Sequence, residues 1–186
     1  EEFDFKIIGV HVNHMIREQE SIKDETYVKE FCCAANIPIY IEEVDVTKIA
    51  QTQKISIEEA GRNVRYDLFF KYLKLNNASK VVVAHNKDDQ SETILLNIIR
   101  GTGSDGLKGM RFKANNIIRP LLNIKKQNIE QYCKTFDLIP RIDLSNWSLV
   151  YSRNKVRHEI IPVINKSMKT NITDKIFQLS EIMNDE

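Results

Sequence analysis

The chain has 186 residues, of which 42% are hydrophobic and 28% charged, a balance typical of one globular domain or of one domain with a small appendage. This excludes a disordered tail, a collagen-like chain and a disulfide-stapled miniprotein, because three cysteines, two of them adjacent, cannot build a disulfide framework. The net charge of +1 divides unevenly, since residues 1–93 carry 12 Lys and Arg against 17 Asp and Glu, whereas residues 94–186 carry 15 against 9.

Strand-like and helix-like segments alternate through the first hundred residues. Short apolar runs rich in β-branched residues predict strands at residues 5–12, 38–46 and 80–84. Helical spacing predicts helices at residues 18–35, 56–75 and 88–100, the second opening with a Ser-Ile-Glu-Glu capping box. Strands this apolar, alternating with helices, predict an α/β fold with a parallel sheet covered on both faces.

After residue 100 the alternation stops. We expect a loop at residues 101–116, at most a short strand at 117–122, a polar loop at 143–152, and helices at 124–136, 151–164 and 171–183. The expected organisation is an α/β core over residues 1–122 followed by a helical segment over residues 123–186. Between residues 100 and 175, 15 basic side chains accompany six acidic ones, which suits a polyanion, although a basic face is more often simply solvated.

The expected compartment is a reducing cytoplasm. The cysteines show no C-x-x-C spacing, no apolar run approaches the ~20 residues of a membrane helix, and the first residues are acidic rather than signal-like.

The sharpest motif is Ala-His-Asn-Lys-Asp-Asp-Gln-Ser-Glu-Thr at residues 84–93, where a predicted buried strand ends and a helix begins. Asp89 and Glu92 share a helix face, Asp88 lies one turn before Glu92, and His85 is close by in the chain. Carboxylates arranged in this way could hold Mg²⁺, bind an ammonium group or act as a general base. The alternative is that acidic residues favour the first turn of a helix through its dipole.

Residues 101–106, Gly-Thr-Gly-Ser-Asp-Gly, match the G-x-G-x-x-G pattern. The dinucleotide-binding fingerprint has to follow a strand and open a helix, whereas this run follows a predicted helix and opens into a loop. We therefore reject that interpretation and expect Gly101 to end the helix in the left-handed conformation. The loop could still line a substrate pocket.

Two pairs of arginines lie at helical spacing. Arg62 and Arg65 could grip a phosphate, or they could pair with the acidic side chains at positions 58 and 59. Arg153 and Arg157 follow a loop rich in Asn and Ser and could hold nucleic-acid phosphates, or they could lie on the solvated face of a capped helix.

Taken together, these stretches resemble the tRNA(Ile)-lysidine synthetase family of PP-loop ATPases. The matching pieces are Val-His-Val-Asn-His-Met-Ile-Arg at 10–17, Glu-Ala-Gly-Arg-Asn-Val-Arg-Tyr at 59–66, His-Asn-Lys-Asp-Asp-Gln-Ser-Glu-Thr at 85–93, Arg-Gly-Thr-Gly-Ser-Asp-Gly-Leu at 100–107, Ile-Arg-Pro-Leu-Leu at 118–122, and then Asp143, Ser145-Asn146 and residues 151–158 and 160–162. The resemblance covers most of residues 7–165. It implies an adenine-nucleotide α-hydrolase-like (PP-loop ATPase) core with a parallel sheet, followed by a small helical appendage.

The resemblance also implies a reaction. ATP adenylates O2 of the wobble cytosine in an isoleucine tRNA with a CAU anticodon, releasing pyrophosphate, and the ε-amine of free L-lysine then attacks C2 and expels AMP. The implied cofactors and substrates are ATP with Mg²⁺, L-lysine and this tRNA, with no membrane partner.

The resemblance assigns roles to individual residues. The catalytic ones are Asp89 and Glu92, which orient the lysine amine, and Arg65, which stabilises phosphate charge. Arg62 and His85 are assigned to the nucleotide. The residues assigned to the substrates, to the tRNA or to holding the substrate loop are Asp88, Arg100, Gly101, Gly103, Arg119, Asn146, Arg153, Asn154 and Arg157. No metal ligand is assigned.

One family feature is missing from the printed sequence, because it contains no Ser-Gly-Gly-x-Asp-Ser run. The triphosphate then lacks its cradle of backbone amides, so we expect residues 1–186 alone not to turn over ATP, and we expect a preceding strand, loop and helix. Two other hypotheses remain. The first is a sister PP-loop enzyme that thiolates tRNA cytidine, and the lack of paired C-x-x-C cysteines counts against it. The second is a non-catalytic RNA-binding remnant that uses the basic residues 100–175.

Overall fold

The computed structural model describes residues 5–141 and 152–185. Its contacts divide the chain into two units, Glu1–Ser79 and Lys80–Glu186, and each is described by itself. The boundary expected between residues 122 and 123 falls inside the second unit and stays a prediction about domain organisation.

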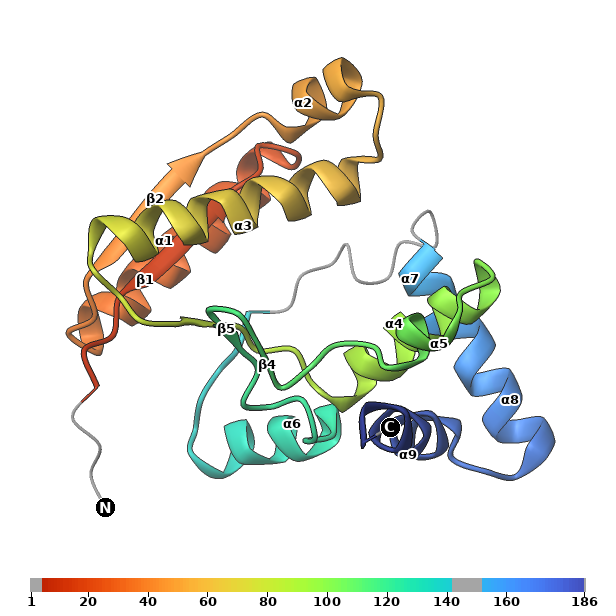
Figure 1. Ribbon diagram of the computed structural model, residues 1–186. Helices are drawn as coiled ribbons and strands as arrows, with labels where there is room; N and C mark the ends of the chain where they lie inside the picture. The colour runs from red at the N-terminus through yellow and green to blue at the C-terminus, as the bar shows by residue number, and fades with distance from the viewer. Residues whose placement is uncertain (1–4, 142–151, 186) are drawn as a thin grey trace. The chain divides into compact units, whose positions relative to one another are not determined.

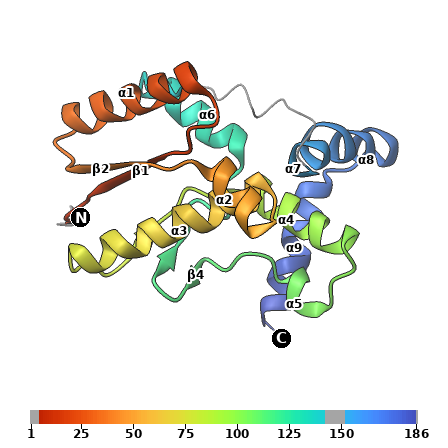
Figure 2. The ribbon, with the colours of Figure 1, turned by 90° about the horizontal axis from the view of Figure 1, so that it is seen from above.

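The first unit contains a parallel strand pair with helices on both sides. Strands β1 (Gly9–Asn13) and β2 (Ile39–Glu43) pair in parallel, with Gly9 opposite Ile39 and Asn13 opposite Glu43. Helix α1 (Glu18–Ala34) connects them, and Figure 2 shows α1 on one side of the pair and α3 (Ile57–Leu75) on the other. This is the strand–helix–strand unit predicted from the sequence, with shorter strands than the apolar runs.

Helix α2 (Val46–Gln53) was not predicted. The carboxylate of Asp45 caps it by accepting a hydrogen bond from the Lys48 backbone N–H at 3.0 Å. The cap predicted for α3 is present, because Ser56 Oγ accepts from the Glu59 N–H at 3.1 Å. Helices α2 and α3 contact each other, and each contains a fully buried apolar side chain, Val46 and Ala60 respectively.

The second unit is built on a short mixed sheet. Strand β3 (Val81–Val82) pairs in parallel with β5 (Ile117–Ile118), and β4 (Lys113–Ala114) pairs antiparallel with β5. Helix α4 (Lys87–Ile99) follows β3, and the short helix α5 (Ser104–Leu107) follows α4 (Figure 1). The prediction of a plain loop over residues 101–116 is therefore wrong at α5 and β4, because segments of four and two residues are too short to show a period.

The rest of the second unit is helical. Its elements are α6 (Lys126–Thr135), α7 (Ser152–Lys155), the π-helical turn η2 (Val156–Ile160), α8 (Ile161–Met168) and α9 (Ile172–Asp185). Helix α9 packs against α4, and the Ser91 hydroxyl donates to the Thr173 carbonyl at 3.0 Å inside this contact. Ile94, Val156 and Ile176 are the buried apolar side chains of the unit's helices.

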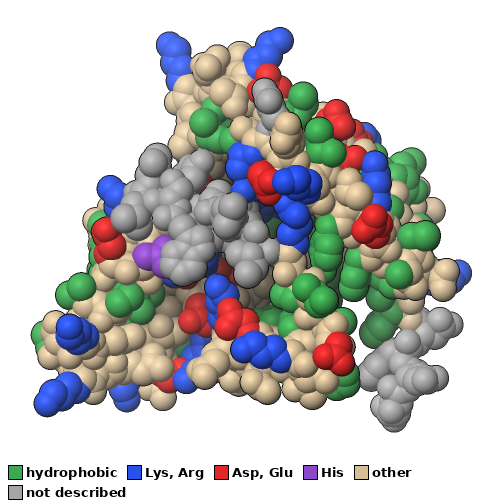
Figure 3. Space-filling view, turned by 180° about the vertical axis from the view of Figure 1, so that it is seen from behind, with side chains coloured by type: hydrophobic (Ala, Val, Ile, Leu, Met, Phe, Trp, Pro, Cys, Tyr) green, Lys and Arg blue, Asp and Glu red, His purple; other side chains and the backbone are tan. Residues whose placement is uncertain are grey.

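The surface mixes charged and apolar groups. Figure 3 shows Lys and Arg side chains interspersed with Asp and Glu, with hydrophobic side chains reaching the surface between them. Within the described ranges, no helix has the length and apolarity that crossing a bilayer requires.

Candidate functional site

The site is built on the first turn of α4, at the carboxyl end of β3. Asn86 Oδ1 accepts from the Asp89 N–H and Asp89 Oδ2 accepts from the Asn86 N–H, each at 3.0 Å, so the two residues form a reciprocal capping box. This cap fixes the Asp89 carboxylate against the helix end. The Asn-x-x-Asp spacing of this capping box is visible in the sequence, but it was not used there to predict a cap for α4.

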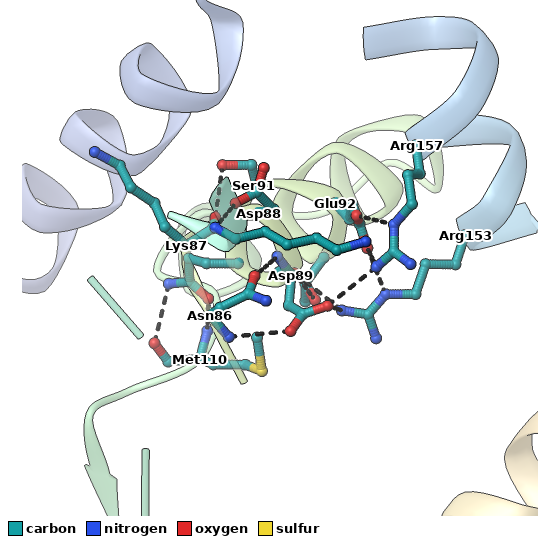
Figure 4. A network of polar contacts seen from close by, with 12 residues as sticks. Asn86, Lys87, Asp88, Asp89, Ser91, Glu92, Met110, Arg153 and Arg157 are labelled. Atoms are coloured by element: carbon teal, nitrogen blue, oxygen red, sulfur yellow. Dashed lines mark hydrogen bonds and ion pairs between the residues drawn. The ribbon is translucent and has the colours of Figure 1, made fainter. Parts of the chain in front are cut away.

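Two carboxylates of α4 meet two arginines from the C-terminal helices. Glu92 Oε2 accepts from Arg153 Nε at 2.8 Å, and Glu92 Oε1 accepts from Arg157 Nε at 2.6 Å. Asp89 Oδ1 receives longer contacts, 3.3 Å from Arg153 Nη2 and 3.2 Å from Arg157 Nη2. Figure 4 shows both guanidinium groups pointing from α7 and η2 toward the two carboxylates. We call these four residues the arginine–carboxylate cluster.

The members of the cluster differ in burial. The Glu92 side chain is 1% exposed, the Asp89 side chain 18%, and both arginine side chains 23%. Burial lowers the pKa of Arg157, but hydrogen bonding to Glu92 and the charges of Glu92 and Asp89 outweigh it, so the pKa is raised. Both Glu92 oxygens accept from guanidinium groups at 2.6–2.9 Å, whereas Asp89 Oδ1 accepts at 3.2–3.3 Å and Asp89 is the more exposed of the two carboxylates.

The structure thus brings together residues that were assigned to different ligands. Asp89 and Glu92 were expected at lysine, and Arg153 and Arg157 at the tRNA or holding the substrate loop. With two charges of each sign, the cluster ties α7 and η2 to α4, and Asp89 is the more exposed of its two carboxylates.

Asp88 and Lys87 join the start of α4 to other helices. Asp88 Oδ2 accepts from the Lys126 N–H at 2.8 Å, at the first turn of α6. Lys87 Nζ lies 2.7 Å from Asp174 Oδ1 of α9 and 4.7 Å from the ring centroid of Phe177. Hydrogen bonds first from Lys125 and then from Lys87 lower the pKa of Asp174. The acidic side chain at position 88 therefore serves the start of a different helix.

Gln90 fixes the loop that follows α5. Its side chain is buried; Oε1 accepts from the Met110 N–H at 2.7 Å, and Nε2 donates to the Met110 and Lys108 carbonyls at 3.0 and 3.3 Å. Gly109 lies between Lys108 and Met110 in the chain and has a φ of +62°. A Cβ atom at this position would lie 2.7 Å from Gln90 Nε2. Glycine is therefore favoured at position 109 by the left-handed backbone and by the close approach of the Gln90 side chain.

Replacing Gln90 with leucine is expected to lower the free energy of unfolding by about 2–3 kcal/mol, because buried backbone groups of the loop lose their partners. Urea denaturation of the 186-residue chain measures this. Gln131→Leu is the matched control, since Gln131 is exposed on α6 and its replacement should change stability little. A loss below about 1 kcal/mol for Gln90→Leu would show that the loop is held by other groups.

Arg119 also serves this loop. It is 6% exposed, and its Nη1 donates to the Arg111 carbonyl at 2.8 Å. The two roles that the resemblance implied for Arg119, meeting the tRNA or holding the substrate loop, both stay predictions.

The remaining assigned residues of the second unit lie around α4, α5 and α7. Arg100 is exposed at the end of α4, and Gly101 follows it with φ +77°, which confirms the predicted left-handed helix end. Gly103 is the N-cap of α5, Asn154 is 8% exposed in α7, and His85 is half-buried just before α4. Asn146 lies outside the described residues.

Arg62 and Arg65 belong to the first unit, on α3. The Arg62 guanidinium stacks on the Tyr66 ring at 5.1 Å, and Arg65 Nη2 lies 3.4 Å from His14 Nε2. In the part of the chain that the structure describes, neither arginine forms an ion pair with Glu58 or Glu59, so the spacing-based alternative is not realised there. His14 was not singled out for this contact by the sequence analysis.

The His14 imidazole is held neutral. A guanidinium only donates, so its 3.4 Å contact with Nε2 suits a ring whose Nε2 carries no proton. The ring lies over Gly61, whose absent Cβ would stand 3.5 Å from Cε1. Burial, and then the charges of Arg65 and His11, lower the pKa of His14 to about 4.

His14 is expected to make stability depend on pH. Because the folded-state pKa is depressed from 6.5 to about 4, its contribution is complete above pH 6.5 and is lost as the pH falls toward 4. Between about pH 7 and pH 5 the parent chain should lose about 1 kcal/mol more stability than His14→Gln, since part of the ring remains solvated. Urea denaturation at both pH values checks this. Equal losses would show that His14 titrates normally.

The structure shows no cluster of metal ligands in its described residues. Across residues 5–141 and 152–185, no three His, Cys, Asp or Glu side chains are grouped as ligands. The two carboxylates of the cluster are engaged by guanidinium groups instead. Mg²⁺ is commonly held by one or two carboxylates together with substrate phosphates, so a complete protein cage is not required for it.

Comparisons with known proteins extend this description. The tRNA(Ile)-lysidine synthase of Clostridium acetobutylicum is 44% identical over 184 residues, which is 98% of this chain and 40% of the relative. The enzyme of the same name from Caldanaerobacter subterraneus is 41% identical over 184 residues, covering 99% of this chain and 39% of the relative. The chain thus spans about 40% of the length of the curated relatives it matches.

A solved structure supports the fold. The U34-tRNA thiolase NcsA from Methanococcus maripaludis, with its [4Fe-4S] cluster, matches 95% of this chain and 62% of its own with a TM-score of 0.71 at 17% identity, which shows a common α/β fold. Residues 1–164 match the family described as the PP-loop domain. The parallel strand pairs and the helical C-terminal portion agree with this match, which covers most of the chain. The chain therefore belongs to the PP-loop domain family.

Proposed function

We propose that this chain forms part of an ATP-dependent tRNA-modifying ligase that converts the wobble cytidine of an isoleucine tRNA into lysidine. The observation that carries the proposal is the identity of about 40% to tRNA(Ile)-lysidine synthases over 98–99% of this chain, a span that includes the arginine–carboxylate cluster. Because those relatives are longer, we assign the reaction to the complete product of the gene.

The proposed chemistry needs an activated oxygen and an oriented amine. ATP adenylates O2 of the cytosine with loss of pyrophosphate, and the ε-amine of L-lysine forms the C2–N bond as AMP leaves with O2. Asp89 is the group we assign to the lysine amine, because its carboxylate is the more exposed one in the cluster. Glu92 is assigned to holding Arg153 and Arg157 in place.

The phosphate charge and the tRNA are assigned to basic groups. Arg62 and Arg65 would stabilise charge on the nucleotide, with Mg²⁺ bound through its phosphates, and His85 would lie near the adenylate. Arg100 with the Gly101–Gly103 backbone would border the cytidine. A wobble base is already unpaired in its loop, so moving it into a pocket costs comparatively little.

Lysine incorporation tests the proposal. The complete gene product is incubated with total tRNA, labelled lysine and either ATP or no nucleotide, and acid-precipitable label is counted after mild alkali has removed ordinary aminoacyl esters. ATP-dependent, alkali-stable label is expected. Absence of such label while tRNA is still bound would overturn the proposal, and sulfur transfer to tRNA under thiolation conditions would favour the thiolating enzyme.

A further inference from the structure

Three consecutive residues, Arg111, Phe112 and Lys113, are all exposed, and none of the assignments above uses their side chains. Phe112 is 58% exposed, and both flanking cations are exposed. Within the residues that the structure describes, neither Arg111 nor Lys113 forms an ion pair with a carboxylate. We call these three residues the 111–113 patch.

The backbone on both sides of the patch is fixed. The Lys108 carbonyl accepts from Asn184 Nδ2 of α9 at 3.0 Å and also from Gln90. The Arg111 carbonyl accepts from the Arg119 guanidinium, and the Phe112 carbonyl accepts from the Arg119 N–H, each at 2.8 Å. Lys113 itself begins β4 and pairs opposite Ile118. The patch is therefore presented on a rigid backbone, which reduces the entropy lost on binding.

The composition of the patch suits one kind of ligand. An exposed aromatic ring between two cations offers a stacking surface for a base and contacts for the phosphates on either side of it. An apolar protein partner would not need cations on both sides of the ring, whereas a polyanion does. The half of the chain that contains the patch also carries 15 Lys and Arg against 9 Asp and Glu.

We propose that the 111–113 patch binds an unpaired nucleotide of RNA, with the Phe112 ring stacked on the base and Arg111 and Lys113 contacting the neighbouring phosphates. The choice of RNA rests on the proposed function. The patch adds a binding surface, outside the arginine–carboxylate cluster, that selects unpaired over paired nucleotides.

The first experiment measures binding of the 186-residue chain to an RNA hairpin with 2-aminopurine in its unpaired loop, and to a blunt RNA duplex of equal length. Phe112→Ala should weaken hairpin binding about tenfold and abolish the quenching of 2-aminopurine, without affecting the duplex. Phe112→Tyr should restore both signals and Phe112→Leu should restore neither, because leucine is apolar but cannot stack. Phe31→Ala, which removes a 51% exposed ring from the first unit, is the matched control and should change nothing.

The second experiment measures the salt dependence of hairpin binding. Arg111→Ala and Lys113→Ala should each reduce the slope of log K against log salt by about one, whereas Lys74→Ala, an exposed lysine on α3, should not. Three results would each overturn this proposal. The parent chain could fail to bind the hairpin, Phe112→Ala could bind it as tightly as the parent, or Phe112→Leu could bind it as tightly as Phe112→Tyr.

The experiments can contradict the proposed function and the 111–113 patch independently of each other. Alkali-stable lysine transfer together with Phe112-independent binding would overturn the patch alone. Phe112-dependent hairpin binding without lysine transfer would overturn the proposed function and keep the patch.

Discussion

Asp89→Asn in the complete gene product is expected to lower lysine transfer about 100-fold or more, because the substitution removes the negative charge that we assign to the attacking amine. Asparagine has the same shape, and its side-chain oxygen can still accept from the Asn86 N–H, which Asp89 Oδ2 accepts at 3.0 Å in the parent. The capping box of α4 is therefore kept, although the new amide Nδ2 faces the Arg153 and Arg157 Nη2 donors that Asp89 Oδ1 accepts from in the parent. Glu92 still accepts from both arginines, so tRNA binding should change little. Single-turnover lysine transfer and tRNA binding, measured in parallel, separate the two effects.

A matched control comes from the same unit. Asp137→Asn makes the same chemical change at an exposed carboxylate just after α6, which forms no ion pair with any described residue. Its lysine transfer should equal that of the parent. An unchanged rate for Asp89→Asn would remove Asp89 from the reacting groups and leave it as a helix cap.

Glu92→Gln is expected to lower the free energy of unfolding of the 186-residue chain by about 3–5 kcal/mol, the usual result of removing one member of a buried ion pair. Glu92 is 1% exposed and accepts from both arginines at 2.6–2.9 Å. Its loss leaves two partly buried guanidinium groups with the Asp89 carboxylate alone. Urea denaturation measures the change.

Glu130→Gln is the control for this substitution. Glu130 is an exposed residue of α6, with Lys126 at 3.8 Å, so its neutralisation should change stability by less than about 0.5 kcal/mol. If Glu92→Gln were as mild as this control, the cluster would not hold α7 and η2 to α4. The Asp89→Asn and Glu92→Gln variants are then compared with each other. Loss of lysine transfer identifies Asp89 as a reacting group, whereas loss of stability identifies Glu92 as a positioning residue.

Features that depend on neighbours along the chain could be predicted from the sequence. The predicted helix at residues 18–35 is Glu18–Ala34, the one at 56–75 is Ile57–Leu75 with its Ser56 cap, and Gly101 has the expected left-handed backbone. Parallel pairing was also predictable, because continuous apolar strands separated by helices have few other ways to bury their faces. The motif at residues 84–93 was correctly placed at the junction of a strand and a helix.

Only the tertiary structure decided which side chains meet. Glu92 and Arg153 are 61 positions apart, and neither local spacing nor composition indicates that they bond. The burial of Arg119, the hold of Gln90 on residues 108–110 and the contact between His14 and Arg65 are likewise contacts between separate elements. The sequence by itself determined the fold family, most of the longer helices, the Ser56 cap and the residue types available for chemistry, since these follow from local periodicity, local hydrogen bonding and family motifs. The pairing of charges in the site was decided by packing, because a charged side chain takes the partner that the folded backbone brings within reach as water is removed.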